Sequence, residues 1–179
     1  MVIHCSEVEA NVLKDGMMIH VASDGQSVNI SNESMSKKKW NVVGVQPNEV
    51  LSKKQVSAVF VLVIKGSQIL TIVNRIRGID IPGGHVDVED ESVLSALHRE
   101  LYEEARAEIS NPQLFAKIDS GKEKQMFFYL DTDASLDEFT ATKEVTERGW
   151  KDISSFLEEY DQGNKKIMRQ LIGLAQKRI

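Results

Sequence analysis

The sequence predicts an α/β fold in which helices cover a mixed β-sheet, with a short β-rich extension in front. Two observations lead to this class. Short apolar runs with strand character lie both before and after one amphipathic helical segment, and two further helical segments end the chain. We assign residues 1–50 to the N-terminal extension and residues 51–179 to the main domain.

Composition agrees with one globular domain plus an appendage. The 179 residues are 41% hydrophobic and 27% charged. The formal net charge of −5 argues against a DNA-binding surface, which is normally basic. The single cysteine, Cys5, excludes an internal disulfide. We expect no membrane partner and a cytoplasmic location, because the longest apolar run is short and the N-terminus has no secretion-signal pattern.

The extension carries three short segments with strand character. Residues 17–21 and 27–30 are separated by the turn residues Asp24 and Gly25, and residues 41–45 could add a third strand. Pro47 and the asparagine after it mark the boundary with the main domain. The three lysines at 37–39 are interpreted as part of a solvated loop.

Two hairpins are expected in the main domain. The β-branched run 56–64 is predicted to be a central strand, which turns back into a strand at 69–73. Residues 113–119 and 125–131 are predicted to form the second hairpin. The period of two in a strand predicts that Phe127 and Tyr129 share one face while Met126 and Phe128 share the other.

The last part of the chain reads as a loop followed by two helices. Residues 133–146 are polar and acidic and form the expected loop. Residues 153–160 predict a short helix, and residues 164–177 predict a longer one with Asn164 as its N-cap. The expected buried face of the longer helix is Ile167, Met168, Leu171, Ile172 and Leu174.

The chemistry is expected on the helix predicted for residues 92–107. At 100° per residue, Glu100, Glu103 and Glu104 fall within an arc of about 100°. Three clustered carboxylates repel one another unless a cation lies among them, and hard oxygen ligands suit Mg²⁺ or Mn²⁺. The alternative is a solvated acidic face on an ordinary amphipathic helix. The adjoining apolar stripe is predicted to be Val93, Leu94, Leu97 and Leu101.

A glycine loop at residues 82–84 lies shortly before this helix and lets the backbone pass close to a ligand. Loop and helix together resemble the Nudix box, G-x5-E-x7-R-E-U-x-E-E-x-G-U, where U is a bulky apolar residue. The residues that match it with the right internal spacing are Glu91, Arg99, Glu100, Leu101, Glu103 and Glu104.

The chain departs from this pattern in two places. Six residues, rather than five, separate Gly84 from Glu91, so the loop has one extra residue. Arg106 stands where the pattern has its late glycine, and Ala107 stands at the final bulky position. Without that glycine we expect the helix to continue until the Asn–Pro pair at 111–112 stops it.

The resemblance implies a Nudix-type α/β/α sandwich with a metal site on this helix. Glu100, Glu103 and Glu104 would hold Mg²⁺ (Mn²⁺ as an alternative), with the Gly84 carbonyl as a further ligand. Arg99 would orient the glutamates. Glu91, at the helix start, is expected to pair with Arg99 or to complement the helix dipole.

The general base differs among members of the family, and Glu103, Glu104 and Glu144 are the candidates here. Glu144 is placed by the similarity of residues 144–150 to a late segment of the family, and Glu147 competes with it for that place. Arg75 and Arg77 lie just before the glycine loop and are candidates for binding the substrate. As plain surface arginines they would have no such role.

The reaction implied is hydrolysis of a nucleoside diphosphate linked to another group. Within that range we favour nucleoside triphosphates or similar small nucleotides; the alternative is an ADP-ribose or nucleotide-sugar pyrophosphatase. A nucleotide sensor that binds without hydrolysis and a purely structural domain are the other classes considered. Some relatives use an N-terminal extension to form a homodimer or to cover the substrate, and the sequence leaves both uses open.

Overall fold

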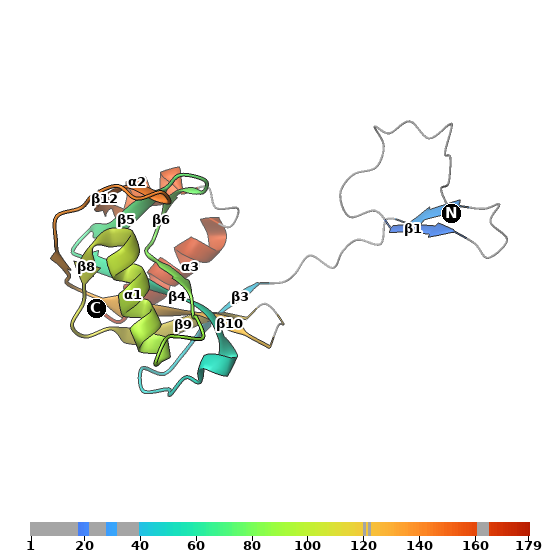
Figure 1. Cartoon of the computed structure of the whole chain (residues 1–179), viewed down its shortest axis with the longest axis horizontal. Coiled ribbons are helices and arrows are strands. Elements are labelled where there is room, and N and C mark those ends of the chain that lie inside the picture. Colours follow the sequence, from blue (N-terminus) through green and yellow to red (C-terminus); the bar gives the residue numbers. More distant parts are fainter. Residues whose placement is uncertain (1–17, 22–27, 32–39, 120, 122, 161–164) are drawn as a thin grey trace. The chain divides into compact units, whose positions relative to one another are not determined.

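The computed structural model describes residues 18–21, 28–31, 40–119, 121, 123–160 and 165–179 (Figure 1). The chain divides into two compact units, residues 1–39 and residues 40–179. In the first unit, β1 (Met18–Val21) pairs antiparallel with β2 (Val28–Ser31). Both strands match predicted segments, while the predicted turn at 24–25 and the lysines at 37–39 lie outside the described residues.

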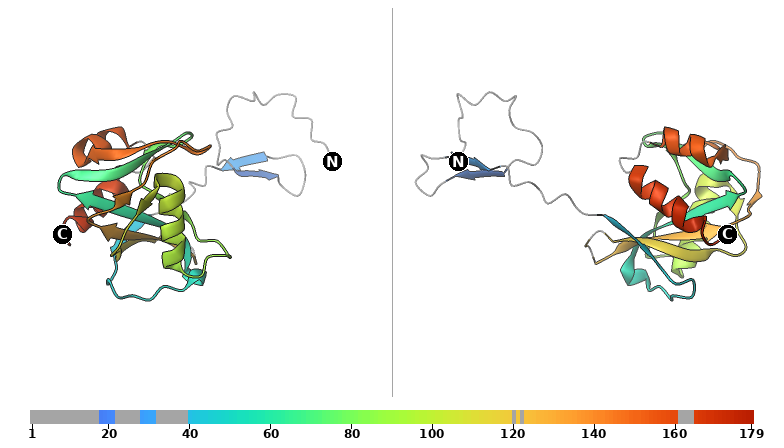
Figure 2. Two further views of the ribbon diagram at one scale, coloured as in Figure 1. Left: turned by 60° about the vertical axis from the view of Figure 1, so that its left-hand side comes forward. Right: turned by 180° about the vertical axis from the view of Figure 1, so that it is seen from behind.

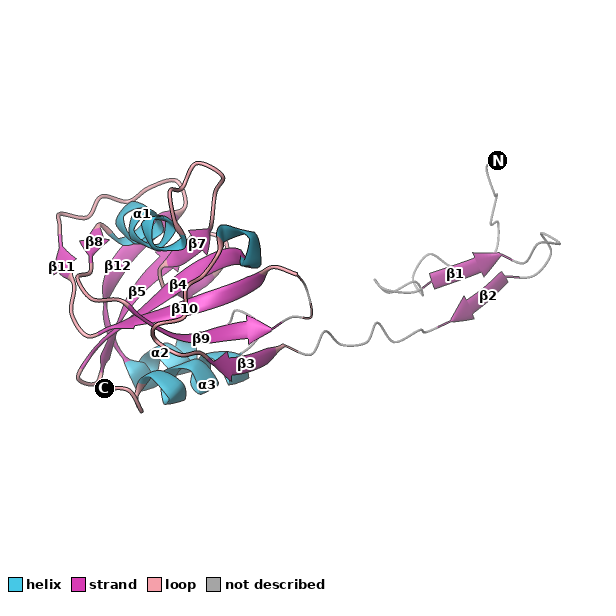
Figure 3. Cartoon of the chain, turned by 90° about the horizontal axis from the view of Figure 1, so that it is seen from below, coloured by secondary structure: helices cyan, strands magenta, loops and turns pink. Residues whose placement is uncertain are grey.

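The second unit is built on one eight-stranded mixed sheet (Figure 3). The strand order is β12-β5-β4-β10-β9-β3, with β6 beside β5 and β7 beside β4. β10 runs parallel to β4, and the other neighbouring strands are antiparallel. The strands are β3 (Asn41–Gly44), β4 (Val56–Lys65), β5 (Gln68–Asn74), β6 (Gly78–Asp80), β7 (Gly83–His85), β9 (Gln113–Asp119), β10 (Gln125–Asp131) and β12 (Val145–Asp152).

Helices cover both faces of this sheet. Figure 3 shows α1 (Val93–Ala105) on one side, with α2 (Ile153–Glu159) and α3 (Lys165–Ala175) on the other. A short 3₁₀ helix, η1 (Lys53–Gln55), leads into β4. The structure therefore confirms the α/β/α sandwich with a mixed sheet. No helix in the described ranges is long and apolar enough to span a membrane.

The central strand β4 is buried on both faces, which is why its sequence is a continuous apolar run. Val59, Val61 and Val63 pack in the core under α1. Leu62 and Ile64 pack in the second core, under α2 and α3. The second predicted hairpin is also confirmed, since β9 and β10 have the predicted bounds. The predicted faces are confirmed as well: Phe127 and Tyr129 lie in the α1 core, and Phe128 and Met126 in or against the other.

The first hairpin opens, and this opening positions the glycine loop. β4 and β5 pair only at Ile64–Ile69 and Lys65–Gln68. Beyond these pairs the two strands diverge, β6 pairs with β5, and β7 pairs with β4. The N–H of Val61 donates to the carbonyl of Pro82 at 3.0 Å, which fixes the loop against the sheet. The views in Figure 2 show α1 standing over this part of the sheet.

The main helix begins as predicted but ends earlier. Ser92 is the N-cap, and its side chain and that of Ser95 each accept the other's backbone N–H. The expected continuation to residues 111–112 is wrong: α1 ends at Ala105, and Arg106 adopts a left-handed conformation (φ 46°, ψ 47°). The chain turns there because Ala107, 1% exposed, is buried at the start of β8 (Ala107–Glu108), which pairs with β11 (Ser135–Leu136).

Three further predictions need adjustment. Leu94, which was predicted to lie in the apolar stripe of α1, is 41% exposed. Ala96 is buried on that side of the helix instead. In α3, Ala175 is buried and Leu174 only partly so, while the predicted cap Asn164 lies outside the described residues. Residues 41–44, which we placed in the extension, form β3 and pair with β9. The main sheet therefore begins at Asn41, ahead of the boundary at residue 50.

Candidate active site

The two glycines of the loop lie where a side chain would collide with its neighbours. At Gly83 (φ 147°) an added Cβ would overlap the Val59 carbonyl and the Phe60 backbone of β4. At Gly84 an added Cβ would overlap the carboxylate of Glu100. The first glycine lets the loop press onto the sheet, and the second leaves room for a carboxylate from α1.

Glu104 is the most enclosed of the three predicted glutamates, with 8% of its surface exposed. Its Oε2 accepts a hydrogen bond from the Gly83 N–H at 2.8 Å. Its Oε1 lies 3.7 Å from Nη2 of Arg77. Burial raises the pKa of Glu104 to about 7, although both partners favour the charged form. Glu104 therefore titrates near neutral pH before any cation binds.

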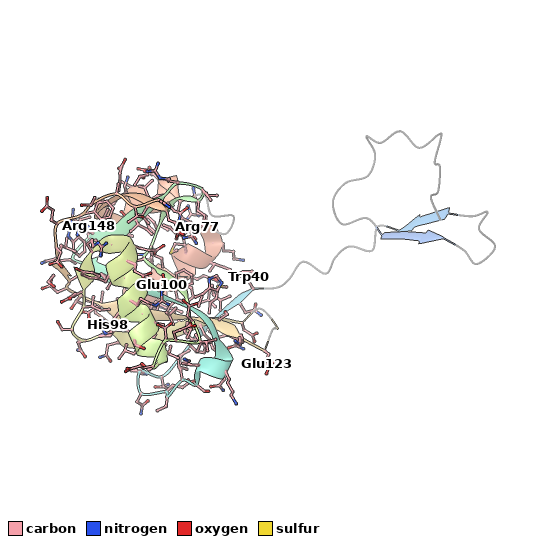
Figure 4. The ribbon with its side chains drawn as sticks, viewed as in Figure 1. Trp40, Arg77, His98, Glu100, Glu123 and Arg148 are labelled. Atoms are coloured by element: carbon pink, nitrogen blue, oxygen red, sulfur yellow. The ribbon has the colours of Figure 1, made fainter. Side chains whose placement is uncertain are left out.

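Glu100 and Glu103 both contact the guanidinium of Arg99. Nη1 of Arg99 donates to Glu100 Oε1 at 3.0 Å and to Glu103 Oε2 at 3.4 Å. Burial also raises the pKa of Glu100, with the Arg99 hydrogen bond opposing the shift. The Glu103 side chain is 58% exposed, so solvent screens this ion pair. Figure 4 shows Glu100 on α1, with Arg77 on the neighbouring segment.

Arg99 is anchored by Asp90, which sequence reasoning missed. Its Nε and Nη2 donate to the two carboxylate oxygens of Asp90, each at 2.9 Å, and Nη2 also reaches the His85 carbonyl at 3.1 Å. This bidentate pair lowers the pKa of Asp90 to about 2 and raises that of Arg99. Lys53 adds hydrogen bonds from its ammonium to the carbonyls of Val88 and Asp90.

The expected pair between Arg99 and Glu91 is therefore wrong. Glu91 is exposed, and its suggested role at the helix dipole stays a prediction. A signal for the true partner was present, because Asp90 follows Gly84 after five residues, the spacing that the Nudix box gives to its first acidic position. The extra residue of this chain thus lies after Asp90, between it and the helix.

The two candidate arginines have different surroundings. Arg77 reaches one of the glutamates: its Nη2 lies 3.7 Å from Oε1 of Glu104, and its Nη1 lies 3.8 Å from Oδ2 of Asp80. Arg75 lies against the loop before β12, since its N–H donates to the Glu144 carbonyl at 2.8 Å and its Nη2 lies 3.5 Å from the Thr142 carbonyl. Both arginines are thus close to residues predicted for the site.

A cavity of about 320 Å³ joins the end of α1 to the loop before β12. It brings the three glutamates of the helix together with Glu144, about 40 positions later in the sequence. Glu147 instead lines a separate groove on β12. The residues that line the cavity are Glu100, Glu103, Glu104, Arg106, Thr142, Lys143, Glu144 and Val145. Arg106, Thr142 and Lys143 were not anticipated from the sequence.

Within the described part of the chain, no three His, Cys, Asp or Glu side chains converge on one point. Each glutamate is turned instead toward an arginine or an amide: Glu104 toward Gly83 and Arg77, and Glu100 and Glu103 toward Arg99. The donor chemistry nevertheless fits a hard divalent cation, because carboxylates from positions 100, 103 and 104 of one helix line one cavity.

A second, smaller cavity of about 120 Å³ lies on the α3 side of the sheet. The rings of Phe60 and Phe128 are stacked in its wall, with centroids 5.3 Å apart. Its buried acid is Asp80, whose pKa is raised by burial. Arg77 contacts both Asp80 and Glu104, so this apolar cavity adjoins the glutamate site. Its lining also includes Trp40, Ile81, Ile118, Met126, Tyr160, Ile167, Met168 and Leu171.

Comparisons with known proteins agree with this fold. The sequence model of the NUDIX domain matches residues 54–171. The crystal structure of a mutator MutT protein from Bacillus halodurans is 25% identical, with a TM-score of 0.50 over 63% of this chain and 78% of that one.

Two further solved structures share the fold. A MutT structure from work on Aliivibrio salmonicida and Vibrio cholerae is 23% identical, with a TM-score of 0.53 over 66% of this chain and 97% of that one. A NUDIX hydrolase from Nitrosomonas europaea is 16% identical, with a TM-score of 0.52 over 66% and 86%. Comparison with curated proteins finds no match.

Proposed function

The chain belongs to the Nudix family of pyrophosphohydrolases, and we propose that it hydrolyses a small nucleotide in a reaction that depends on a divalent metal ion. One observation carries the proposal. The cavity at the end of α1 gathers three box glutamates, one of them buried, beside a glycine loop that leaves room for the Glu100 carboxylate. The three carboxylates outnumber the two arginines, Arg77 and Arg99, that contact them, and a pyrophosphate linkage needs charge neutralisation for its cleavage.

Glu100, Glu103 and Glu104 would hold Mg²⁺ or Mn²⁺, with the Gly84 carbonyl as a further ligand. The ion would neutralise negative charge on the phosphate oxygens around the bond that breaks. Arg99 would keep Glu100 and Glu103 in place through its hydrogen bonds to both, while Asp90 fixes the guanidinium. Nudix hydrolases generally use divalent metal ions, which supports this assignment.

The base that takes a proton from the attacking water would be one of three glutamates. Glu104 is engaged with the Gly83 N–H and Arg77, which suits a ligand. Glu103 and Glu144 are exposed and line the same cavity, which suits proton exchange with solvent. Replacing each by Gln separates the roles: a base variant loses kcat and keeps Mn²⁺ affinity, whereas a ligand variant loses Mn²⁺ affinity.

The substrate we propose is a nucleoside triphosphate or a similar small nucleotide. Arg75, Arg77 and Lys143 bring positive charge to the site on a chain that is otherwise acidic. The aromatic cavity beside Arg77 offers stacking surface and one carboxyl group, which suits a nucleobase. In this proposal the phosphates of the substrate bind at the glutamate cavity, and its nucleoside lies in the aromatic cavity that contains Asp80.

A substrate screen tests the proposal. The purified chain with Mg²⁺ is assayed against nucleoside triphosphates, nucleoside monophosphates, ADP-ribose, nucleotide sugars and dinucleoside polyphosphates, and products are identified by mass in ¹⁸O-labelled water. We expect turnover of linked phosphates, none of monophosphates, and none in excess EDTA. A preference for ADP-ribose or a nucleotide sugar would replace the proposed substrate, and tight nucleotide binding without turnover would indicate a sensor.

A further inference from the structure

Arg148, in β12, makes an unusual set of contacts with the end of α1. Its Nη1 lies 3.0 Å from the Ala105 carbonyl and 3.3 Å from the Arg106 carbonyl. The same nitrogen lies 3.0 Å from the carbonyl of Asp137, in the loop after β11. The guanidinium also stands over the ring of Phe139, 5.5 Å from its centroid. One side chain thus joins a strand, a helix end and a loop (Figure 4).

These contacts occur where a helix needs them. The last carbonyls of a helix have no partners within it, and they form the negative end of the helix dipole. In α1 the left-handed Arg106 turns the chain away immediately after Ala105. Arg148 supplies a cation and a donor to these carbonyls, and the N–H of Asp137 donates to the Arg106 carbonyl at 2.9 Å. Arg148 therefore holds the last turn of α1, which carries Glu103 and Glu104.

The same residue is tied to the opposite wall of the cavity. Val145, at the start of β12, lies three positions before Arg148 and lines the cavity together with Glu144. This stretch is fixed to the sheet by the hydrogen bond from the Arg75 N–H to the Glu144 carbonyl and by the pairing of β12 with β5. Arg148 does not line the cavity, but its hydrogen bonds join β12 to the end of α1, and these two elements carry residues of the two walls.

We infer that Arg148 is a positioning residue for the proposed reaction, because it fixes the distance between the glutamates at the end of α1 and the Glu144 loop. It acts through Glu103, Glu104 and Glu144. The kinetic part of this inference rests on the proposed function. The structural part of the inference is that Arg148 holds the glutamates in place. Mn²⁺ affinity tests this part without any measurement of hydrolysis.

The chain offers a matched control. Arg178 also donates to two backbone carbonyls, those of Leu114 (3.2 Å) and Val45 (2.6 Å), but it lies outside the glutamate cavity. Arg148→Met and Arg178→Met each remove one arginine clamp of this kind. Arg148→Lys keeps the charge and loses the planar guanidinium. Thermal unfolding, Mn²⁺ affinity and steady-state kinetics are measured for the three variants in the full chain.

We expect Arg148→Met to weaken Mn²⁺ affinity and to lower kcat, each by about tenfold, as for outer-shell partners of metal ligands. Arg148→Lys should recover part of both losses. Arg178→Met should lower the unfolding temperature while Mn²⁺ affinity and kcat stay unchanged. The kcat loss of Arg148→Met should shrink in a Glu144→Gln background, because both changes disturb the same wall.

Unchanged Mn²⁺ affinity and kcat in folded Arg148→Met, with only its unfolding temperature lowered, would overturn the inference. If Arg148→Met does not fold, Arg148→Lys takes its place: a weaker Mn²⁺ affinity than wild type supports the positioning role, and an unchanged one overturns it. A wild-type chain that binds Mn²⁺ but hydrolyses nothing refutes the proposed function alone, since the affinity comparison still decides the role of Arg148.

Discussion

Asp90 and Glu91 are adjacent acids with different surroundings, and the single extra residue in the loop explains the difference. The loop keeps its five-residue spacing from Gly84 to Asp90, so Asp90 reaches Arg99 and Glu91 faces solvent. Spacing counted backward from Arg99 pointed to Glu91. The sequence pattern predicts an acidic residue near Arg99. It does not determine whether the extra residue lies before that acidic residue or after it.

We predict that Asp90→Asn lowers both stability and kcat, while Glu91→Gln changes neither. The folded-state pKa of Asp90 is depressed from 3.8 to about 2. Its contribution to stability is therefore fully present above pH 3.8 and is lost as the pH falls toward 2. Chemical denaturation should show that the difference in free energy of unfolding between the wild type and Asp90→Asn becomes smaller as the pH falls from 3.8 toward 2. Equal stability of the two proteins at pH 7 would contradict the role of the Asp90–Arg99 pair.

The box glutamates give the second prediction at this scale. Glu100→Gln and Glu104→Gln should each lower kcat by about 10²-fold or more, because each removes a charged oxygen ligand or a base. Folding should survive or improve, since burial disfavours the charged form of both carboxylates. Glu108→Gln, at an exposed position on β8, is the control and should keep wild-type kinetics. Wild-type rates and Mn²⁺ affinity in both test variants would place the site elsewhere.

Glu104 also predicts how stability depends on pH in the metal-free protein. Burial raises its pKa from 4.5 to about 7, so the folded state holds this proton more tightly than the unfolded state. Stability from this group is fully present below pH 4.5 and declines as the pH rises to about 7. In EDTA, the free energy of unfolding of Glu104→Gln should therefore increase relative to that of the wild type as the pH rises from 4.5 to about 7. A difference that is independent of pH would contradict the raised pKa.

Among the elements, β4, β9, β10 and the start of α1 could be predicted, because each depends on a local signal. Apolar runs of suitable length mark the strands, and the helical spacing of Val93, Leu97 and Leu101 marks the first turns of α1. The end of α1 could not be predicted. It depends on the burial of Ala107 and on the Arg148 hydrogen bonds, and both come from distant parts of the chain.

Arg106 offers a test at the scale of this element. The left-handed conformation costs a residue with a Cβ about 1–2 kcal/mol, and glycine adopts it freely. After the entropy that glycine adds to the unfolded chain, Arg106→Gly should be more stable than Arg106→Ala by about 0.5–1 kcal/mol, since both variants lack the arginine side chain. Arg106→Ala keeps the strained conformation and removes the guanidinium, which lies 4.9 Å from the centre of the Tyr102 ring, so it should lower stability. Urea titration of both variants gives the comparison, and an Arg106→Gly variant less stable than Arg106→Ala would contradict it.

At the scale of the whole molecule, the site depends on pairings that the sequence does not reveal. The glycine loop reaches α1 because β6 and β7 enter the gap between β4 and β5. Glu144 reaches the same cavity because β12 pairs with β5 on the far side of that gap. Each glutamate could be proposed from its local motif. Their meeting with Lys143 and Arg106 requires the sheet order, which comes from long-range pairing.

The division of the chain gives the last prediction. Residues 40–179 contain all eight strands of the main sheet and its three α-helices, so this fragment should fold alone and unfold at the same temperature as the main domain of the full chain. A fragment of residues 51–179 lacks β3, leaves the edge of β9 unpaired, and loses Val45, which is 4% exposed and donates its N–H to the Phe115 carbonyl. Loss of one fully buried valine alone costs about 2 kcal/mol, or roughly 4–8 °C in the unfolding temperature of a domain of this size. Thermal unfolding of the two fragments beside the full chain measures the difference.

Equal unfolding temperatures for both fragments would support a domain boundary at residue 50. A fragment of residues 40–179 that unfolds well below the full chain would show that residues 1–39 contribute to the stability of the main domain.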